Sequence, residues 1–361
     1  MKITILTGLG ESEFASNFCL ARALEKAGCE TWLMGPNYDE RRSILDLPEV
    51  DYVLPDRPYP HFYSYKEVVA NSPWKPDVIF AIDPRGAVNG EKPKGVVSCF
   101  YSTDNHRAGE LHTKLTKEGQ YDVVFVGQGG YLPFFEKSAP IVKVLWPAVE
   151  SSRFPYDFMI GPECDIAFVG HTGLDINGPL DQDYNGSWYC KKPSRKTYSG
   201  NAPSYDYAER GELLFRLCYD FNVRLYQPAW KTPSLSLALQ QGKIGFNHSI
   251  LHDLSIRNFE VMAAERALVT DDICLPPTLP SFRSIVADGM CSRVYPSLYR
   301  PFYANFDVQY AYVKRIIEDL LSDDHERENM SYRARNYALS RHTWDNRATE
   351  VIQTIEKAVR Q

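Results

Sequence analysis

The sequence lacks several features that assign a chain to a common class of protein. None of its eight cysteines forms the Cys-x-x-Cys pair typical of zinc sites and redox motifs, which favours buried free thiols in a reducing compartment. No apolar run reaches the roughly 20 residues that span a bilayer, and residues 1–7 predict a strand rather than a secretory signal. We therefore expect a cytoplasmic protein without integral membrane association.

The sequence also lacks an excess of positive charge. Its formal net charge is −6, so no global field draws it to nucleic acid or to an anionic membrane, and either partner would need a local basic patch. With 44% hydrophobic and 24% charged residues, the composition is that of an ordinary soluble globular protein. A length of 361 residues is enough for two domains.

The N-terminus predicts a β-α-β unit with a glycine turn. A strand at residues 2–7 leads through Gly8 and Gly10 to an amphipathic helix at 14–26 and a second strand at 30–34. Such a turn brings backbone N–H groups close to a phosphate or a sugar. Because the third glycine of a dinucleotide fingerprint is missing, a plain tight turn remains the alternative.

Further parallel strands are predicted where short apolar runs are bounded by Pro, Gly or Asp. These runs lie at residues 50–54, 78–82, 96–101, 123–127 and 141–145, and the segments between them, such as 65–70 and 108–117, are predicted as helices or loops. Asp104 and His106 directly follow one of these strands, at the sheet edge where ligands bind, and could hydrogen-bond a sugar. The alternative is a solvated loop in which Asp104 caps the next helix.

A strand followed by a glycine turn opens a second domain at residues 165–171, with Gly170 and His171 in the turn. Residues 172–208 then form a long insertion, and such loops are usually functional or disordered. Its aromatic residues, interleaved with cations, could stack bases and contact phosphates of an acceptor; a solvated loop with packed tyrosines is an equal alternative. The acceptor candidates are Trp188, Tyr189, Lys191, Lys192, Arg195 and Lys196.

Residues 245–272 predict a strand, a polar loop, a helix at 256–266 and another strand. Ser255 is the predicted N-cap, and Arg257 and Glu260 share one face of the first helical turn. A helix N-terminus at this sheet edge offers free N–H groups and positive potential to a phosphate. A cation and a carboxylate beside it could hold a phosphate and a sugar hydroxyl together. The alternative is an ordinary salt-bridged helix face.

Three more helices are predicted towards the C-terminus, at residues 308–321, 326–339 and 344–360. Five segments carry a resemblance to a known family: FYSTDNH at 100–106, DVVFVGQGGYLPFF at 122–135, DIAFVGH at 165–171, SIRNFEVMAAERALVTDD at 255–272 and ARNYALSRHTWDNRATEVI at 334–352. In their order and spacing they resemble the GT-B glycosyltransferases, and more narrowly the CgeB-like branch of the group-1, retaining enzymes. The resemblance covers most of the chain.

The resemblance implies an α/β protein with the GT-B fold, in which two Rossmann-like β/α domains face a central cleft. Residues 1–153 would form the N-terminal, acceptor-side domain. Residues 154–343, with the insertion at 172–208, would form the nucleotide-sugar-binding domain. Residues 344–361 would be a C-terminal helix that crosses back to the N-terminal domain.

The resemblance also implies a reaction, the transfer of a sugar from a nucleotide sugar to an acceptor hydroxyl with retention of configuration. A UDP-sugar is expected rather than a GDP-sugar. Glu260 would bind the ribose hydroxyls, and Arg257 would neutralise the diphosphate. The implied catalytic set is His106, Asp104 and Arg257, with the first two facing the donor sugar. The implied nucleotide-sugar site comprises Gly8, Gly10, Gly170, His171, Ser255, Arg257, Asn258 and Glu260.

In such enzymes the helix dipole and cations replace a metal ion, so the resemblance implies no metal site and no required cofactor besides the donor. The leaving phosphate takes the proton of the acceptor, so no separate carboxylate base is needed.

Three departures from the family pattern leave alternatives open. His252 stands where group-1 enzymes often have a first glutamate eight positions before Glu260, and Glu265 stands where a small residue usually follows the alanine pair. The insertion at 172–208 replaces a shorter connection. A non-catalytic binding protein of the same shape and a sugar-nucleotide epimerase are therefore alternatives. The acceptor could be a small molecule, a glycan or lipid, a protein or hydroxymethylated DNA.

Overall fold

The chain divides into two compact units in a computed structural model. Unit 1 is formed by residues 1–150 and 343–361, and unit 2 by residues 151–342; the sequence places these boundaries at 153 and 343. The structure describes residues 1–8, 16–36, 51–55, 62–83, 85–103, 105–155, 161–174, 181–182, 188–193, 205–226, 234–250, 253–296 and 306–360. None of the helices within these ranges is long and apolar enough to cross a membrane.

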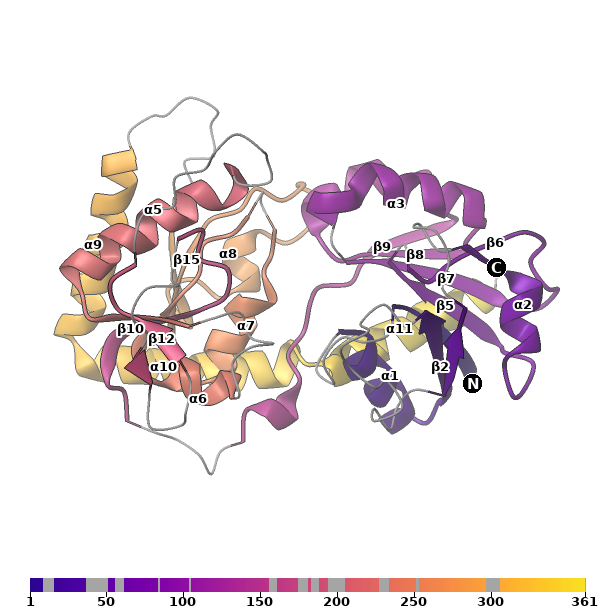
Figure 1. Cartoon of the computed structure of the whole chain (residues 1–361), viewed down its shortest axis with the longest axis horizontal. Coiled ribbons are helices and arrows are strands. Elements are labelled where there is room, and N and C mark those ends of the chain that lie inside the picture. Colours follow the sequence, from indigo (N-terminus) through magenta and orange to yellow (C-terminus); the bar gives the residue numbers. More distant parts are fainter. Residues whose placement is uncertain are drawn as a thin grey trace. The chain divides into compact units, whose positions relative to one another are not determined.

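Unit 1 is built on a parallel sheet (Figure 1). Its described strands, in sheet order, are β3 (Tyr52–Leu54), β2 (Glu30–Pro36), β1 (Lys2–Leu6), β5 (Val78–Ile82), β7 (Val97–Ser102), β8 (Val123–Val126) and β9 (Ile141–Val144). Its described helices are α1 (Ser16–Lys26), α2 (Tyr65–Ala70), α3 (Asn105–Gly119), α4 (Leu132–Phe135) and α11 (Trp344–Val359), and a separate parallel pair joins β4 (Phe62–Ser64) to β6 (Ala87–Asn89).

Unit 2 is built on a second sheet, parallel except at one edge. Its described strands, in sheet order, are β11 (Asp181–Gln182), β12 (Trp188–Cys190), β13 (Val223–Tyr226), β10 (Cys164–Val169), β14 (Gly242–Phe246), β15 (Ala267–Asp271) and β16 (Ser292–Tyr295). Its described helices are α5 (Tyr205–Asp220), α6 (Leu235–Gln240), α7 (Ile256–Ala263), α8 (Phe282–Ile285), α9 (Phe306–Ser322) and α10 (Asp324–Arg341).

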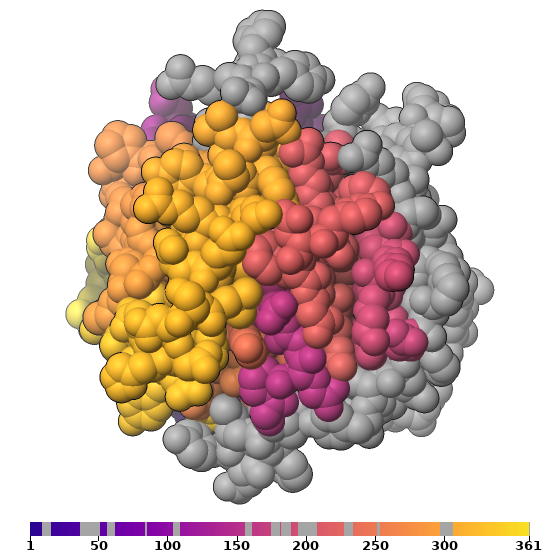
Figure 2. Space-filling view, turned by 90° about the vertical axis from the view of Figure 1, so that its left-hand side faces the viewer, coloured from indigo at the N-terminus to yellow at the C-terminus, as the bar shows by residue number. Residues whose placement is uncertain are grey.

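Helices α5 and α9 lie side by side on one face of unit 2, which Figure 2 presents. Arg216 of α5 pairs with Asp307 at the start of α9 at 2.6 Å. Tyr310 and Lys314 of α9 donate to Asp220 at the end of α5, at 2.6 and 2.9 Å. Beneath them, apolar residues of both helices pack on one face of the sheet. The opposite face is covered in part by α7 and α10, which pack on each other.

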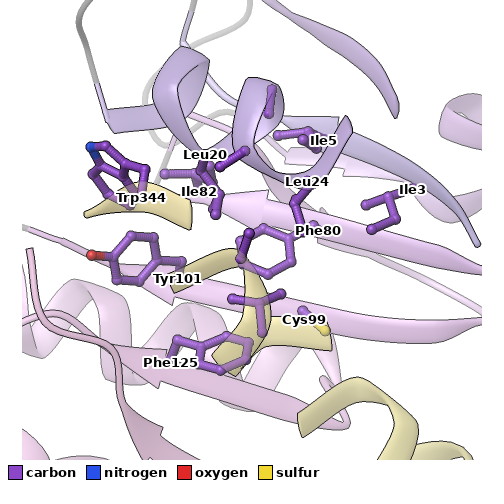
Figure 3. Close-up of a cluster of buried hydrophobic side chains, with 14 of the residues drawn as sticks. Ile3, Ile5, Leu20, Leu24, Phe80, Ile82, Cys99, Tyr101, Phe125 and Trp344 are labelled. Carbon is purple, nitrogen blue, oxygen red and sulfur yellow. The ribbon is translucent and has the colours of Figure 1, made fainter. Parts of the chain in front are cut away.

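Both faces of the unit 1 sheet are buried, each in its own hydrophobic core. Successive side chains of a strand point to opposite faces and therefore enter the two cores in turn. Phe80 and Ile82 of β5 join the core beneath α1 and α11, whereas Ile79 and Ala81 join the core on the other face. Figure 3 shows the first of these cores, in which the rings of Phe80 and Phe125 stack with their centroids 5.7 Å apart. The sheet is thus an internal layer, and its functional surface is left at the strand ends.

Helix α11 belongs to unit 1 although it follows unit 2 in the sequence. Trp344, Ala348, Val351 and Ile355 of this helix are buried in the same core as α1, and Trp344 lies beside the α1 side chains in Figure 3. Thr343 begins the helix with a capping box, in which its side chain and that of Asn346 each bond the other residue's backbone N–H.

Several elements differ from those predicted. The helix predicted at 326–339 runs from Asp324 to Arg341, because Asp323 caps it two residues earlier by accepting from Glu326 N. The short elements α4, α6, α8 and β16 were not predicted. Part of the predicted 172–208 insertion is sheet, since β11 and β12 extend the edge of unit 2 beyond β13. Helix α5 begins inside the same range, at Tyr205.

Candidate functional site

Helix α7 follows the C-terminal end of β14, and its first turn carries the residues singled out by the sequence. Ser255 is its N-cap, as predicted: the residue is extended, and its side chain accepts from Arg257 N at 3.2 Å. The N–H of Asn258 also donates within this turn, to Ser255 O at 3.1 Å. The first turn of α7 is therefore a capped helix end, whose positive potential favours an anion.

Arg257 and Glu260 form a buried ion pair, with Arg257 Nη1 2.7 Å from Glu260 Oε2. Arg153 Nη1 lies 3.7 Å from the other carboxylate oxygen of Glu260, a contact not foreseen from the sequence. Burial lowers the pKa of Arg257 below its usual value, and nearby Arg153 lowers it further, whereas Glu260 raises it. Two guanidinium groups thus flank one carboxylate, in a place where water screens their charges poorly.

Three side chains of this helical turn have hydrogen-bonding capacity that the described residues do not use. Arg257 Nη1 and Glu260 Oε2 meet as an ion pair without the alignment of a hydrogen bond, and Asn258 Nδ2 has no hydrogen-bond partner among the described residues. Asn258 is only 1% exposed. Because such buried groups cost free energy, their concentration in one turn is typical of a site that a polar ligand completes.

The loop between β14 and α7 is held by side chains that the sequence analysis missed. Asn247 Nδ2 donates to Asn258 Oδ1 at 2.9 Å, so the end of β14 is tied directly to α7. Arg210 of α5 donates through Nε to the carbonyl of His248 at 2.8 Å, and the ring of His248 bonds the hydroxyl of Tyr295 at 2.8 Å. No local sequence pattern predicts these contacts, since Arg210 lies 38 residues before His248 and Tyr295 lies 47 residues after it.

The end of α7 corrects a prediction. The helix was expected to reach residue 266 but ends at Ala263, because Glu265 takes a left-handed conformation with φ +58. Glu265 N then donates to Met262 O at 3.0 Å, and Arg266 N to Val261 O at 3.3 Å, the two bonds of a Schellman motif. Glycine usually occupies this position and marks the end of a helix in a sequence. Because Glu265 stands here instead, the sequence does not show where α7 ends.

Gly170 and His171, the other predicted residues of this unit, follow β10. Gly170 has φ +143, a conformation that favours glycine. The backbone carbonyl of His171 accepts from Arg210 Nη1 at 3.1 Å, while Nε of the same guanidinium donates to the carbonyl of His248. Arg210 therefore links the turn after β10 to the loop after β14, at neighbouring ends of the parallel sheet.

In unit 1, Gly8 follows the end of β1 and is buried; its carbonyl accepts from Asn17 of α1 at 3.5 Å. Two other glycines crowd this strand end. A Cβ at Gly35 would lie 1.6 Å from Thr7 O, and one at Gly86 would lie 2.2 Å from Leu6 O. The end of β2 and the loop after β5 therefore pack against the backbone that leads into the predicted glycine turn.

Several predicted residues lie outside what the structure describes. Gly10, Asp104, Arg195 and Lys196 fall outside the described residues, as does His252. His106 lies in α3 and Trp188 in β12, but the positions of their side chains are not described. Their predicted roles stay predictions.

The described part of the acceptor candidates is structurally mixed. Tyr189 is 4% exposed, and its ring packs against Tyr226 at 5.5 Å and beneath the guanidinium of Arg224 at 4.5 Å. The expectation that Tyr189 stacks an acceptor from a loop is therefore wrong, because pairing of β12 with β13 turns this side chain into the core. Lys191 and Lys192 are exposed, and Lys191 pairs with Asp181 at 3.1 Å.

Among the residues that the structure describes, no group of three or more His, Cys, Asp or Glu side chains is arranged to hold a metal ion. The metal independence implied by the resemblance stays a prediction, because it concerns the reaction rather than this arrangement.

Comparisons with known proteins agree with this fold. Residues 206–353, which include α7 and its loop, match a family model described as glycosyl transferase-like. No curated protein matches the chain in sequence.

Among solved structures, a sucrose-phosphate synthase from Thermosynechococcus elongatus has a TM-score of 0.58 at 10% identity, covering 99% of this chain and 98% of that chain. A glycosyltransferase from Rickettsia africae has a TM-score of 0.59 at 8% identity, with the same coverage. An alpha-glucosyltransferase in complex with UDP and a 13-mer DNA containing a HMU base has a TM-score of 0.56 at 10% identity, covering 100% of both chains.

At these identities the solved structures establish the fold, and the predicted GT-B class is confirmed. The CgeB-like branch stays a prediction. The chain thus has the GT-B fold, and its residues 206–353 match a glycosyl transferase-like family.

Proposed function

We propose that the chain transfers a sugar from a UDP-sugar to an acceptor hydroxyl with retention of configuration and without a metal ion. The observation that carries the proposal is the buried pair of Arg257 and Glu260, flanked by Arg153, in the capped first turn of α7. This turn lies within the region that matches the glycosyl transferase-like family. It also lies beyond the C-terminal end of β14, where ligands bind in open α/β sheets.

In this proposal, the carboxylate of Glu260 accepts hydrogen bonds from the ribose hydroxyls. An ionised carboxylate has about four acceptor positions, so its ion pair with Arg257 leaves capacity for two hydroxyls. Asn258 Nδ2, which is buried without a hydrogen-bond partner among the described residues, donates to the nucleotide. Together these groups fix the nucleoside by contacts that change little during the reaction.

Arg257 and the N–H groups of the first turn stabilise the departing diphosphate. As the glycosidic bond breaks, negative charge grows on the oxygen that links the sugar to the phosphate. A fixed cation in a buried site lowers the energy of that charged state without needing to reorganise. The departing phosphate then accepts the proton of the acceptor hydroxyl, and Asp104 and His106 orient the donor sugar.

A uridine donor is supported by the alpha-glucosyltransferase that shares the fold and was solved with UDP. The acceptor is a glycan or a hydroxymethylated DNA. The structure of that enzyme with DNA motivates the second choice. The exposed Lys192 offers local positive charge for it, whereas the charge of Lys191 is paired with Asp181. The net charge of −6 counts against it.

The test uses the full-length protein with UDP and UDP-glucose. UDP binding is measured by calorimetry, and donor hydrolysis by release of UDP. Glu260→Ala should weaken UDP binding by about 1.5–3 kcal/mol, as expected for lost hydrogen bonds to a charged group.

The matched control is Glu350→Ala. It breaks the Arg347–Glu350 pair of α11, which has the same residue types and spacing and a distance of 2.8 Å, but belongs to unit 1. UDP affinity should be unchanged in this variant. If wild-type protein binds no uridine nucleotide, the proposed donor is wrong. Binding of UDP-sugars without turnover in the presence of glycan and DNA acceptors would instead favour a non-catalytic binding protein.

A further inference from the structure

Asp271, the last residue of β15, binds both donors of a single residue on the neighbouring strand end. Its Oδ1 accepts from the backbone N–H of Ser249 at 2.7 Å, and its Oδ2 accepts from the hydroxyl of the same serine. Asp271 is 0% exposed and Ser249 2% exposed. A buried carboxylate requires such donors to be stable, so the pair fixes the backbone of Ser249 against β15.

Ser249 is the third of three successive residues held in place at the start of the β14–α7 loop. Asn247 is bonded to Asn258 of α7, and the carbonyl of His248 is bonded to Arg210. The His248 ring faces three groups from other elements: the Tyr295 hydroxyl at 2.8 Å, Glu209 at 3.6 Å and Asp271 at 3.8 Å. The loop therefore leaves the sheet with its direction fixed by side chains of α5, α7, β15 and β16.

Unit 1 contains the same arrangement at the ends of two of its own strands. Asp83, after β5, accepts from the backbone N–H of Thr103 at 2.8 Å and from the Thr103 hydroxyl. Asp83 has φ +56, an uncommon conformation for a residue other than glycine. In each unit, an aspartate at one strand end thus holds the N–H and the hydroxyl of a serine or threonine that follows the adjacent strand.

We propose that Asp271 is a positioning residue for the nucleotide, acting through Ser249 and the loop to place the first turn of α7. The inference rests on the proposed function. Because Asp271 is fully buried, its effect on a ligand is transmitted by the loop backbone rather than by contact. The two hydrogen bonds from Ser249 to Asp271 are called the clamp below. Without the clamp the loop can shift where it leaves β14, and the Arg257–Glu260 pair then loses the alignment on which binding of a diphosphate depends.

The experiment compares two matched variants of the full chain, Ser249→Ala and Thr103→Ala. Each removes the hydroxyl half of one clamp and keeps the backbone half. The dissociation constant for UDP and the thermal unfolding midpoint are measured for both. Ser249→Ala should weaken UDP binding about tenfold, because binding must then supply part of the free energy that this hydrogen bond to a charged group contributes to the position of the loop. Both variants should lower the thermal unfolding midpoint by similar amounts. Thr103→Ala should leave the UDP dissociation constant within about twofold of the wild-type value, since it acts in the other unit.

Two further variants separate positioning from folding. Asp271→Asn keeps the shape of the clamp but removes its charge, and should weaken UDP binding at least as much as Ser249→Ala. Ser249→Thr keeps the hydroxyl and should restore most of the affinity. Equal UDP affinity in wild type, Ser249→Ala and Asp271→Asn would show that the clamp is only structural and overturn this inference alone. If wild-type protein binds no UDP, the proposed function falls and takes this inference with it.

Discussion

The carboxylate of Glu265 lies 3.7 Å from the guanidinium of Arg335, and this contact accompanies a backbone conformation normally reserved for glycine. Arg335 of α10 also donates to Ala263 O at 2.6 Å and to Phe154 O at 2.7 Å. It therefore ties the C-terminus of α7 to the segment that carries Arg153. The ion pair offsets the backbone strain at Glu265, which costs about 1 kcal/mol or slightly more.

The first prediction concerns this pair. Arg335→Met should destabilise unit 2 by about 3–5 kcal/mol, because it leaves Glu265 and two carbonyls without their buried partner. In the Arg335→Met background, adding Glu265→Gly should recover at least about 1 kcal/mol, because it relieves the strain of the left-handed residue and removes the carboxylate that has lost its partner. Urea unfolding of both variants measures this. A further loss of stability in the double variant would contradict the role given to the backbone.

The second prediction concerns Arg257. Arg257→Ala should reduce the rate of UDP-glucose turnover by about 100-fold, because charge on the departing diphosphate grows in the transition state. UDP binding should weaken less than the rate. Initial rates at saturating donor and calorimetric titration with UDP separate the two effects. Equal losses in rate and in affinity would mean that Arg257 serves ground-state binding only.

The third prediction concerns pH. Burial lowers the pKa of His112 from 6.5 to about 4. As pH falls below about 6.5, the unfolded chain binds a proton at this side chain before the folded chain does. The contribution of His112 to stability is therefore complete above pH 6.5 and is lost progressively down to about pH 4.

Between pH 7 and pH 5 the loss should be about 2 kcal/mol. His112→Gln should remove this part of the pH dependence and leave the part due to other groups. Comparing urea unfolding of wild type and variant at the two pH values measures the difference. Identical slopes would show that the folded protein accommodates the charged imidazole.

The fourth prediction separates the two roles found within the insertion. Tyr189→Ala should destabilise the protein by about 3–5 kcal/mol, as expected when a buried aromatic ring is removed. Replacing exposed Lys191 and Lys192 by Ala should change stability by less than about 1 kcal/mol. Unfolding curves of the two variants give the comparison.

The same lysine variant tests the proposed DNA acceptor. If phosphates of DNA contact Lys191 and Lys192, binding of a hydroxymethylated oligonucleotide should depend less steeply on salt after their replacement. A salt dependence equal to that of wild type would exclude these two lysines from the acceptor site and favour a neutral glycan.

The sequence predicts those parts of the site that depend on neighbouring residues. The N-cap at Ser255 and the pairing of Arg257 with Glu260 follow from helical spacing, and the structure contains both. The end of α7 follows instead from Arg335, about 70 residues away. No local sequence pattern indicates that Glu265 takes a positive φ and ends the helix. The helix was therefore predicted three residues too long.

Contacts between distant segments explain the other omissions. Asp271 and Ser249 lie 22 positions apart, and only the parallel pairing of β14 with β15 brings their strand ends together. Tyr189 was taken for a loop residue because its strand is short and pairs with β13, more than 30 positions later. Arg153 meets Glu260 across more than 100 positions, a separation that no periodic pattern bridges.

The return of α11 to unit 1 has a consequence for the synthesis of the protein. Trp344, Ala348, Val351 and Ile355 complete the core that covers one face of the first sheet. A ribosome makes the chain from its N-terminus, at about 5–20 residues per second. Residues 1–150 are therefore synthesised before all of unit 2, and α11, which completes their core, is synthesised after it. During that interval apolar side chains of the sheet and of α1 remain open to water. The core of unit 1 therefore becomes complete only after unit 2 has been synthesised.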